Sequence, residues 1–172
     1  MKILNLHGFM GEADNKNYKA LCGIVSPDDI ISPKLHYKEA LPLELIEMLS
    51  SMLSTDDMIL VGQSLGGWYA DQLSRKYQMP CILTNPCYYP HKLELIRESG
   101  ISEVSLEQYQ ELSANDQNKQ AYVLCSNADT VLPNNYANCI AFAKSIKCVN
   151  GSHSTIIDLQ EHLSDIIAMI VK

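Results

Sequence analysis

The sequence predicts an α/β protein with a mainly parallel sheet of about six strands, helices on both faces and a short helical cap insertion. Short runs rich in Ile, Val and Leu alternate with longer segments of helical period, and the apolar residues within the runs are mostly continuous rather than alternating. Continuous apolarity is typical of strands covered on both faces, and strand alternating with helix implies right-handed crossovers and a doubly wound sheet. A chain of 172 residues suits one domain, because that length can bury roughly 70% of its unfolded surface. We therefore expect residues 1–172 to form a single domain.

The apolar runs place the strands in order along the chain. They predict strands at residues 2–6, 29–31, 58–61, 81–84, 121–125 and 147–149. Helices are expected between them, at about residues 15–25, 41–53, 65–77, 134–144 and 155–171. The last helix has the clearest amphipathic spacing. Its apolar stripe consists of Ile156, Leu159, Leu163, Ile166, Ile167 and Ile170.

One segment interrupts the alternation. Residues about 86–119 are too many for a plain crossover, and they include a helix-forming run at 105–112. We expect this segment to be a cap inserted over the edge of the sheet.

Charge and hydropathy narrow the classes of function. The formal charge of −7 would repel a phosphate backbone, and Lys and Arg form no basic run, so we expect no nucleic-acid partner. Only Ile3, Leu4 and Leu6 are apolar between Lys2 and His7, too few for a signal peptide, and nowhere are there eighteen consecutive apolar residues. We therefore expect a cytoplasmic protein without a membrane span.

The six cysteines show no CxxC spacing, which favours buried free thiols over disulfides. They are Cys22, Cys81, Cys87, Cys125, Cys139 and Cys148. A zinc site needs closely spaced Cys and His ligands, which are absent. The spacing of the glycines at residues 62–67 matches neither GxGxxG nor GxxxxGK(S/T), the two glycine motifs that bind nucleotides. We expect no metal and no cofactor.

The strand at 58–61 runs directly into Gly62-Gln63-Ser64-Leu65-Gly66 and then into a helical pattern. A nucleophile elbow requires this context, because its serine lies on a strained strand-to-helix turn where a Cβ two residues before or after would clash. We expect Ser64 to be a nucleophile and the Leu65 backbone N–H to be one oxyanion donor. The alternative is a plain tight turn, since the bare motif arises by chance in roughly one chain in twenty.

The first predicted strand ends in Leu6-His7-Gly8-Phe9. In hydrolases this loop supplies the second oxyanion donor. We assign that role to the backbone N–H of Phe9, because Gly8 lets the main chain approach closely. His7 is expected to support the loop.

Five histidines compete for the role of general base. His153 lies between the last predicted strand and the last helix, on the sheet edge where it can reach Ser64. The alternative for His153 is that it packs or helps to cap the helix. The other histidines are His7, His36, His91 and His162. All of them except His7 are expected to be solvated at the surface.

An acid is needed to hold His153 in the correct tautomer. Asp129 lies in a polar loop after the strand at 121–125, on the same sheet edge. The alternative is a capping or turn aspartate, and the rival acids are Asp158 and Asp116. The chain order Ser64, Asp129, His153 is the order that the α/β-hydrolase fold uses.

These segments resemble the small bacterial YqiA/YcfP-like esterases, a compact branch of the α/β-hydrolase superfamily. The resemblance covers the whole chain, through residues 7–9, 64–67, 85–86, 129–132 and 151–153. It implies activity on acyl esters or thioesters, with no metal or organic cofactor. The sequence departs from the family at Ser154-Thr155 and within 87–89, so the resemblance leaves the substrate open.

The residues themselves predict a serine hydrolase that forms an acyl-enzyme intermediate on a small-molecule ester or thioester. Tyr88 and Tyr89 are candidates for a wall of the acyl pocket, with a cap core as the alternative. Asn85 either lines the cleft or satisfies backbone groups in the turn set by Pro86. The other open functions are an acyl-CoA thioesterase, a peptidase or carbon–carbon hydrolase on the same residues, and a catalytically silent binding protein.

Overall fold

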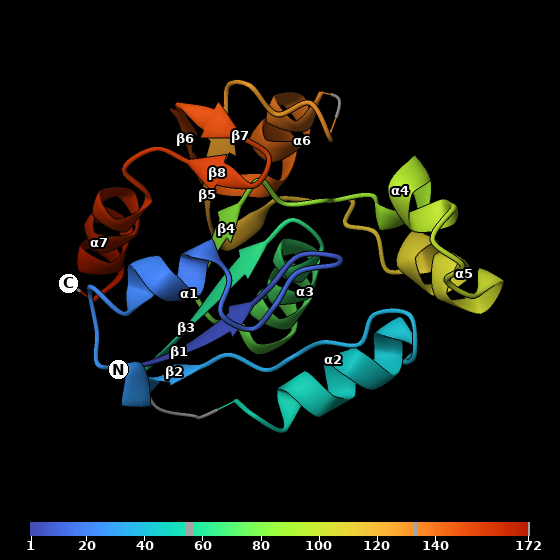
Figure 1. The fold of residues 1–172 in the computed structure, drawn as a ribbon, viewed down its shortest axis with the longest axis horizontal. Coiled ribbons are helices and arrows are strands. Elements are labelled where there is room, and N and C mark those ends of the chain that lie inside the picture. The colour runs from blue at the N-terminus through green and yellow to red at the C-terminus, as the bar shows by residue number, and fades with distance from the viewer. Residues whose placement is uncertain (54–56, 133, 172) are drawn as a thin grey trace.

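The computed structural model describes residues 1–53, 57–132 and 134–171; residues 54–56, 133 and 172 lie outside it. Its main sheet has six strands in the order β2-β1-β3-β4-β5-β6, and every neighbouring pair is parallel (Figure 1). The strands are β1 (Lys2–Leu6), β2 (Ile30–Ile31), β3 (Met58–Gln63), β4 (Cys81–Thr84), β5 (Asn118–Ser126) and β6 (Ala143–Val149). The predicted fold class is therefore confirmed.

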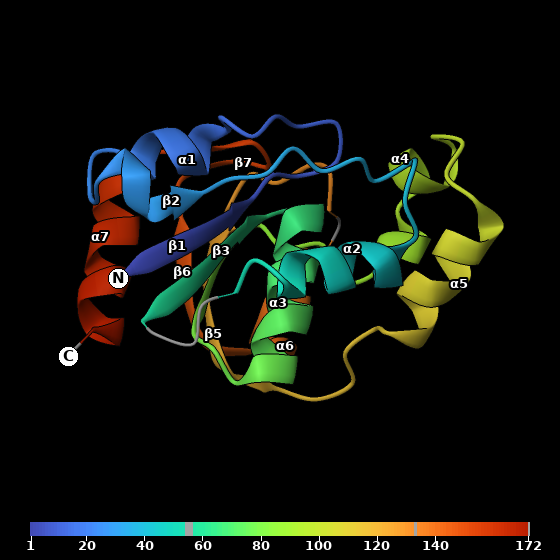
Figure 2. The same ribbon diagram turned by 90° about the horizontal axis from the view of Figure 1, so that it is seen from below.

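Helices cover both faces of the sheet (Figure 2). On one face lie α1 (Lys16–Leu21) and α7 (Leu159–Ile170), which bury one apolar cluster with the sheet. On the other lie α2 (Pro42–Ser50), α3 (Leu65–Tyr77) and α6 (Asn135–Phe142), which bury a second cluster. Successive strand residues point to opposite faces. Ile3 and Ile59 accordingly belong to the first cluster, whereas Leu4 and Leu60 belong to the second.

The segment between β4 and β5 carries η2 (Pro90–Lys92), α4 (Glu94–Arg97) and α5 (Glu103–Glu111). Figures 1 and 2 place it beyond the carboxyl ends of the strands. The Tyr109 ring packs 4.9 Å from the Trp68 ring, and its hydroxyl lies 2.9 Å from that of Tyr69. The Leu43 N–H donates to Gln108 Oε1 at 3.1 Å. The insertion is thus held to α3 and α2, and its Gln117 side chain also donates to the Ala143 carbonyl of the edge strand β6 at 2.8 Å.

Four of the five predicted helices differ in their bounds from the observed ones: α1 ends at Leu21 and α2 at Ser50, short of the predicted residues 25 and 53, and two others begin or end differently. Residues 155–171 do not form one helix, because β8 (Thr155–Ile156) pairs with β7 (Gly151–Ser152) in an antiparallel hairpin. Asp158 then takes a left-handed φ of 55°, and α7 begins after it. The helix predicted at 134–144 ends at Phe142, because Ala143 turns to extended backbone and begins β6.

The cysteine expectation was right for most positions and wrong for Cys148. All six cysteines are free, and Cys81, Cys87, Cys125 and Cys139 are buried. Cys148 is exposed, because its side chain projects from a largely uncovered stretch of β6, and Cys22 is half-buried.

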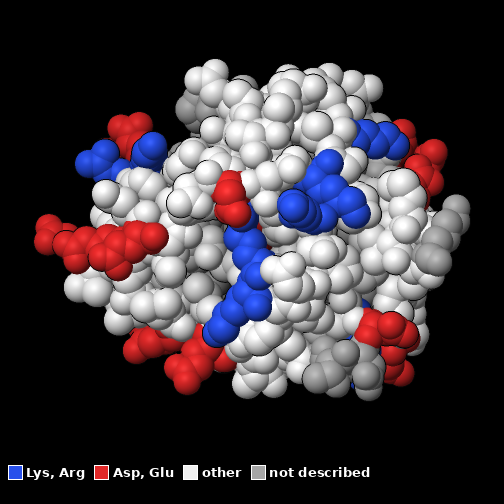
Figure 3. All heavy atoms as spheres, turned by 180° about the vertical axis from the view of Figure 1, so that it is seen from behind, with Lys and Arg blue, Asp and Glu red and all other residues white. Residues whose placement is uncertain are grey.

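The surface carries charges of both signs. On the face in Figure 3, Lys and Arg side chains lie scattered among Asp and Glu, and most of the surface is uncharged. Throughout residues 1–53, 57–132 and 134–171, no helix has both the length and the apolar character that crossing a membrane requires.

Candidate active site

Ser64 occupies a strained turn between β3 and α3. Its backbone angles are φ 53° and ψ −117°, a conformation that costs a non-glycine residue of order 1–3 kcal/mol. The surrounding backbone holds it there: the Ser64 N–H donates to the Thr84 carbonyl at 3.0 Å, and the Ser64 carbonyl accepts from the Cys87 N–H at 3.0 Å. The strand-turn-helix context predicted for this serine is present.

The two glycines of the motif are required by close backbone contacts. A Cβ on Gly62 would lie 2.4 Å from the Gly66 carbonyl oxygen. A Cβ on Gly66 would lie 2.3 Å from the carbonyl oxygen of Leu6. The predicted clashes at both positions are confirmed, because real Cβ atoms do not approach backbone atoms so closely.

Three loops bring Ser64, His153 and Asp129 together. His153 lies on the turn between β7 and β8, and its Nε2 is 2.9 Å from Ser64 Oγ. Its Nδ1 is 2.8 Å from Asp129 Oδ2, where Asp129 follows β5. The side chains are enclosed, with exposed fractions of 15% for His153 and 4% for Asp129. This arrangement allows a proton to pass from the serine hydroxyl to the imidazole.

The Asp129 carboxylate is held in its charged form. Burial by itself would raise its pKa, but the hydrogen bond with His153 and those from two backbone N–H groups lower it below the ordinary value. The backbone donors are Val131 at 2.9 Å and Leu132 at 3.0 Å, both to Oδ1. Asp129 therefore has one oxygen fixed by its own loop and the other left for His153.

The loop after β1 passes directly beside the serine. A Cβ on Gly8 would lie 3.2 Å from Ser64 Cβ and 3.8 Å from Ser64 Oγ. Among the described residues, the next N–H along the chain, that of Phe9, donates no hydrogen bond. Leu65 is the first residue of α3, and the first N–H groups of a helix have no partner within it. Both N–H groups are available to an oxyanion.

His7 is buried beneath this loop, with 1% of its surface exposed. Its Nδ1 lies 2.8 Å from the Gly8 carbonyl, and its Nε2 accepts the Leu35 N–H at 2.9 Å. These partners require a neutral ring with the proton on Nδ1. Burial lowers the pKa of His7, in agreement with that state. His7 supports the loop, as expected.

The remaining histidines and acids lie elsewhere. His36 is exposed and pairs with Glu39 at 3.4 Å, and Asp116 pairs with Arg75 at 2.7 Å. The expectation of solvated surface histidines was wrong for His91 and His162. Both are half-buried, and the Nδ1 of each is enclosed without a hydrogen-bond partner within the described part of the chain.

Asn85 is placed differently from either expectation. Its side chain is 0% exposed, so it does not face an open cleft. Its amide donates to the carbonyls of Ser152 at 3.1 Å and His153 at 2.9 Å, and its oxygen accepts the Ser126 N–H at 2.7 Å. Sequence reasoning named the residue but not these partners. Its position before Pro86, at the end of the strand beside the elbow, was the available signal.

Tyr88 and Tyr89 line a cavity of about 510 Å³, whose lining includes none of Ser64, Asp129 and His153. Other lining residues are Cys87, whose N–H binds the Ser64 carbonyl, and Val131 and Leu132, whose N–H groups bind Asp129. Lys92 lies at the rim, with Nζ 4.3 Å from the centre of the Tyr89 ring. The cavity is therefore bounded by segments that touch both Ser64 and Asp129.

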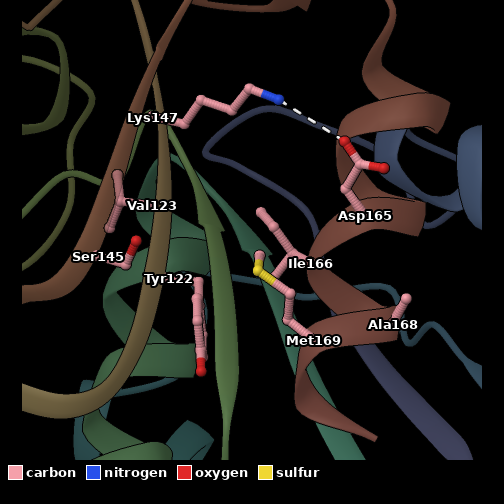
Figure 4. A pocket seen from close by; sticks show the side chains of 8 residues that line it. All are labelled: Tyr122, Val123, Ser145, Lys147, Asp165, Ile166, Ala168 and Met169. Carbon is pink, nitrogen blue, oxygen red and sulfur yellow. Dashed lines mark ion pairs between the residues drawn. The ribbon is translucent and has the colours of Figure 1, made fainter. Parts of the chain in front are cut away.

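A second cavity, of about 490 Å³, lies between α7 and strands β5 and β6 (Figure 4). Lys147 and Asp165 form an ion pair of 3.7 Å across it, above the apolar side chains of Ile166 and Met169. Ser64, Asp129 and His153 do not line it. Among the described residues, no cluster of three or more His, Cys, Asp or Glu side chains is placed to hold a metal ion.

The model of the Uncharacterised protein family (UPF0227) matches residues 2–171. The chain belongs to this family. UPF0227 corresponds to the YqiA/YcfP group that the sequence resembles, so the predicted family is confirmed.

Solved structures similar to this UPF0227 chain are α/β hydrolases. The mouse alpha/beta hydrolase domain-containing protein 10 is 15% identical with a TM-score of 0.66, over 99% of this chain and 88% of that one. Est1E of Butyrivibrio proteoclasticus with bound ferulic acid is 11% identical with a TM-score of 0.65, over 99% and 90%. The type II thioesterase BorB of the borrelidin cluster is 14% identical with a TM-score of 0.59, over 99% and 89%. At these identities the likeness establishes the fold.

Proposed function

We propose that this protein is a serine hydrolase that cleaves carboxylic esters or thioesters through an acyl-enzyme intermediate. The observation that carries the proposal is the pair of contacts made by His153, 2.9 Å to Ser64 Oγ and 2.8 Å to Asp129 Oδ2. A serine, a base and an orienting acid in this relation are the parts that nucleophilic catalysis needs.

In the first step, Ser64 Oγ attacks the acyl carbonyl carbon while His153 Nε2 takes the hydroxyl proton. The N–H groups of Phe9 and Leu65 stabilise the negative oxygen of the tetrahedral intermediate. The bond to the leaving group then breaks, and His153 returns the proton to the departing alcohol or thiol. Asp129 stabilises the imidazolium form throughout.

In the second step, water attacks the acyl-enzyme. His153 takes one proton from the water, the bond between Ser64 Oγ and the acyl carbon breaks, and the proton returns to Ser64. The free acid leaves. The acyl group would lie in the 510 Å³ cavity against Tyr88 and Tyr89, since a cavity of this size is within the usual range for small-molecule sites.

The test is replacement of Ser64. Ser64→Ala is expected to reduce kcat on p-nitrophenyl butyrate by at least about a thousandfold while the protein stays folded. Ser145→Ala, at an exposed serine on β6, is the matched control and should behave as wild type. A fluorophosphonate probe should label wild type and the control but not Ser64→Ala. Equal hydrolysis by wild type and Ser64→Ala would exclude Ser64 as nucleophile.

The choice between ester and thioester needs a direct comparison. One structural neighbour is a thioesterase and another is a protein with bound ferulic acid, so the fold is compatible with either class. Rates on an oxygen ester and a thioester with the same acyl group would separate the two. A silent binding protein would neither be labelled nor turn over either substrate.

A further inference from the structure

Asn85 lies at the end of β4 in a conformation that is unusual for a residue with a side chain. Its φ is 45°, it is fully buried, and its N–H donates to the Leu124 carbonyl of the neighbouring strand at 2.9 Å. Left-handed backbone is uncommon outside glycine, and asparagine tolerates it better than most residues. Such strain persists only where the surrounding contacts hold it.

The side chain of Asn85 uses both ends of its amide. Oδ1 accepts the Ser126 N–H at 2.7 Å, at the end of β5. Nδ2 donates toward the carbonyls of Ser152 and His153, at 3.1 and 2.9 Å, and toward Ser126 Oγ at 2.9 Å. Because the backbone N–H can only donate and the carbonyls can only accept, these partners admit one orientation of the amide.

The two carbonyls belong to the turn that carries the candidate base. Among the described residues, no other side chain hydrogen-bonds to the backbone of Ser152 or His153. The turn joins two strands of only two residues each, β7 and β8. Asn85 is thus the side chain that reaches the two carbonyls of the turn from the end of β4, whereas Asn127, which follows β5, accepts the Gly151 N–H of β7 at 3.3 Å.

We propose that Asn85 is a positioning residue for His153, acting through the amide bridge from the end of β5 to the Ser152 and His153 carbonyls. The inference rests on the function proposed above, because the position of His153 affects turnover only if His153 acts as the base. His153 must meet Asp129 and Ser64 at once, and a displacement of about 1 Å can cost roughly a hundredfold in rate. The hairpin is also held to the segment after β5 at Gly151, whose N–H bonds to Asn127 and whose carbonyl bonds to the Ala128 N–H, but among the described residues only Asn85 bonds through its side chain to the backbone of the turn itself.

The test uses two variants and a matched control. Asn85→Asp keeps an acceptor for the Ser126 N–H but removes both donors, and Asn85→Ala removes the whole amide. The control is Asn118→Ala, at the opposite end of β5. Asn118 is also buried, donates to Asp71 and Ser74, and accepts the Gln120 N–H, so it loses a comparable set of bonds far from Ser64.

Three measurements separate positioning from general support. We expect both Asn85 variants to lower kcat on p-nitrophenyl butyrate by roughly a hundredfold with KM within about twofold. We expect the far-downfield proton resonance of the His153 ring N–H bonded to Asp129 to weaken or disappear in both. Asn118→Ala should lower the melting temperature at least as much, while kcat and the resonance stay near those of wild type.

Wild-type kcat and an unchanged resonance in folded Asn85 variants would overturn the proposal. So would Asn85 variants that fail to fold at the assay temperature, because the amide would then support the whole sheet rather than one turn. Failure of the proposed function would give a different result: wild type would show the resonance but would neither turn over the ester nor react with a fluorophosphonate. A wild type lacking resonance and turnover alike would overturn both.

Discussion

Gly66 lies against Leu6 so closely that a Cβ on the glycine would stand 2.3 Å from the Leu6 carbonyl oxygen. The His7 carbonyl oxygen would lie at 2.4 Å from the same atom. Both are backbone atoms, at the end of β1 and in the loop that follows it. The same loop carries the Phe9 N–H. The contact therefore links the helix after Ser64 to the opposite side of the candidate oxyanion site.

Gly66→Ala is expected to destabilise the protein by at least about 3 kcal/mol, because rigid backbone on both sides must shift to admit the methyl group. Urea unfolding followed by circular dichroism measures this. Gly100→Ala is the control, at a glycine with φ of 83° and no atom within 4 Å of the added Cβ. It should cost only about 1–2 kcal/mol, from backbone strain, and leave ester hydrolysis intact.

Asp129→Asn is expected to lower kcat by roughly 10⁴, because an amide no longer favours the His153 tautomer or its charged form. The fold should survive, since the amide oxygen can still accept the Val131 and Leu132 N–H groups. Steady-state kinetics on a p-nitrophenyl ester measures the effect. The rival acid Asp158 supplies the comparison: Asp158→Asn should leave kcat unchanged, and a large loss there would reverse the assignment.

His7 predicts a pH dependence of stability. Burial lowers its pKa in the folded protein, whereas the unfolded chain has an ordinary value of about 6.5. As the pH falls through about 6.5, the unfolded state therefore binds the proton first, and stability present above that pH is progressively lost.

Urea unfolding of wild type from pH 8 to pH 5 should show this loss, and His7→Gln should show less of it because glutamine does not titrate. His36→Gln, at an exposed histidine, should follow the wild-type profile. Identical profiles for wild type and His7→Gln would contradict the assignment of a neutral, buried His7.

Arg75 predicts a stability effect without a catalytic one. Its Nε lies 2.7 Å from Oδ2 of Asp71, a carboxylate only 1% exposed. Burial raises the pKa of Asp71, and Arg75 opposes that shift. Arg75→Gln leaves a buried charge without its partner and should cost about 3–5 kcal/mol in urea unfolding. Lys76→Gln, at the exposed neighbour, should be nearly neutral, and both variants should keep wild-type kcat while folded.

Local signals were sufficient for the sheet and for the serine turn. Apolar runs located all six strands. The runs are clearest at β3 and β4, because a strand buried on both faces has no solvent-facing side to be polar, whereas β6 is largely exposed. The elbow was readable because Gly62, Ser64 and Gly66 lie within five residues. Ser64, Asp129 and His153 could be grouped from the sequence because each was expected on a loop at the same edge of a parallel sheet.

Pairing between distant segments could not be predicted from such local patterns. The pattern at Ile156 fits a helical stripe, yet the residue lies in β8, because pairing with Gly151 and the left-handed Asp158 override the helical period. The exposure of Cys148 depends on what covers its face of β6, most of whose residues are exposed. An apolar run carries no information about which of its faces will be covered.

The sequence by itself determined the fold class, the family and the identity of Ser64 as the residue of the elbow, because each depends on periodicity or on residues adjacent in the chain. Only the tertiary structure decided that Asn85 bonds to the carbonyls of Ser152 and His153, and that the ring of His7, already expected to support its loop, is neutral. Those roles depend on hydrogen bonds between residues 28 and 68 positions apart. Such bonds are set by how the strand ends and loops pack together, which no local pattern encodes.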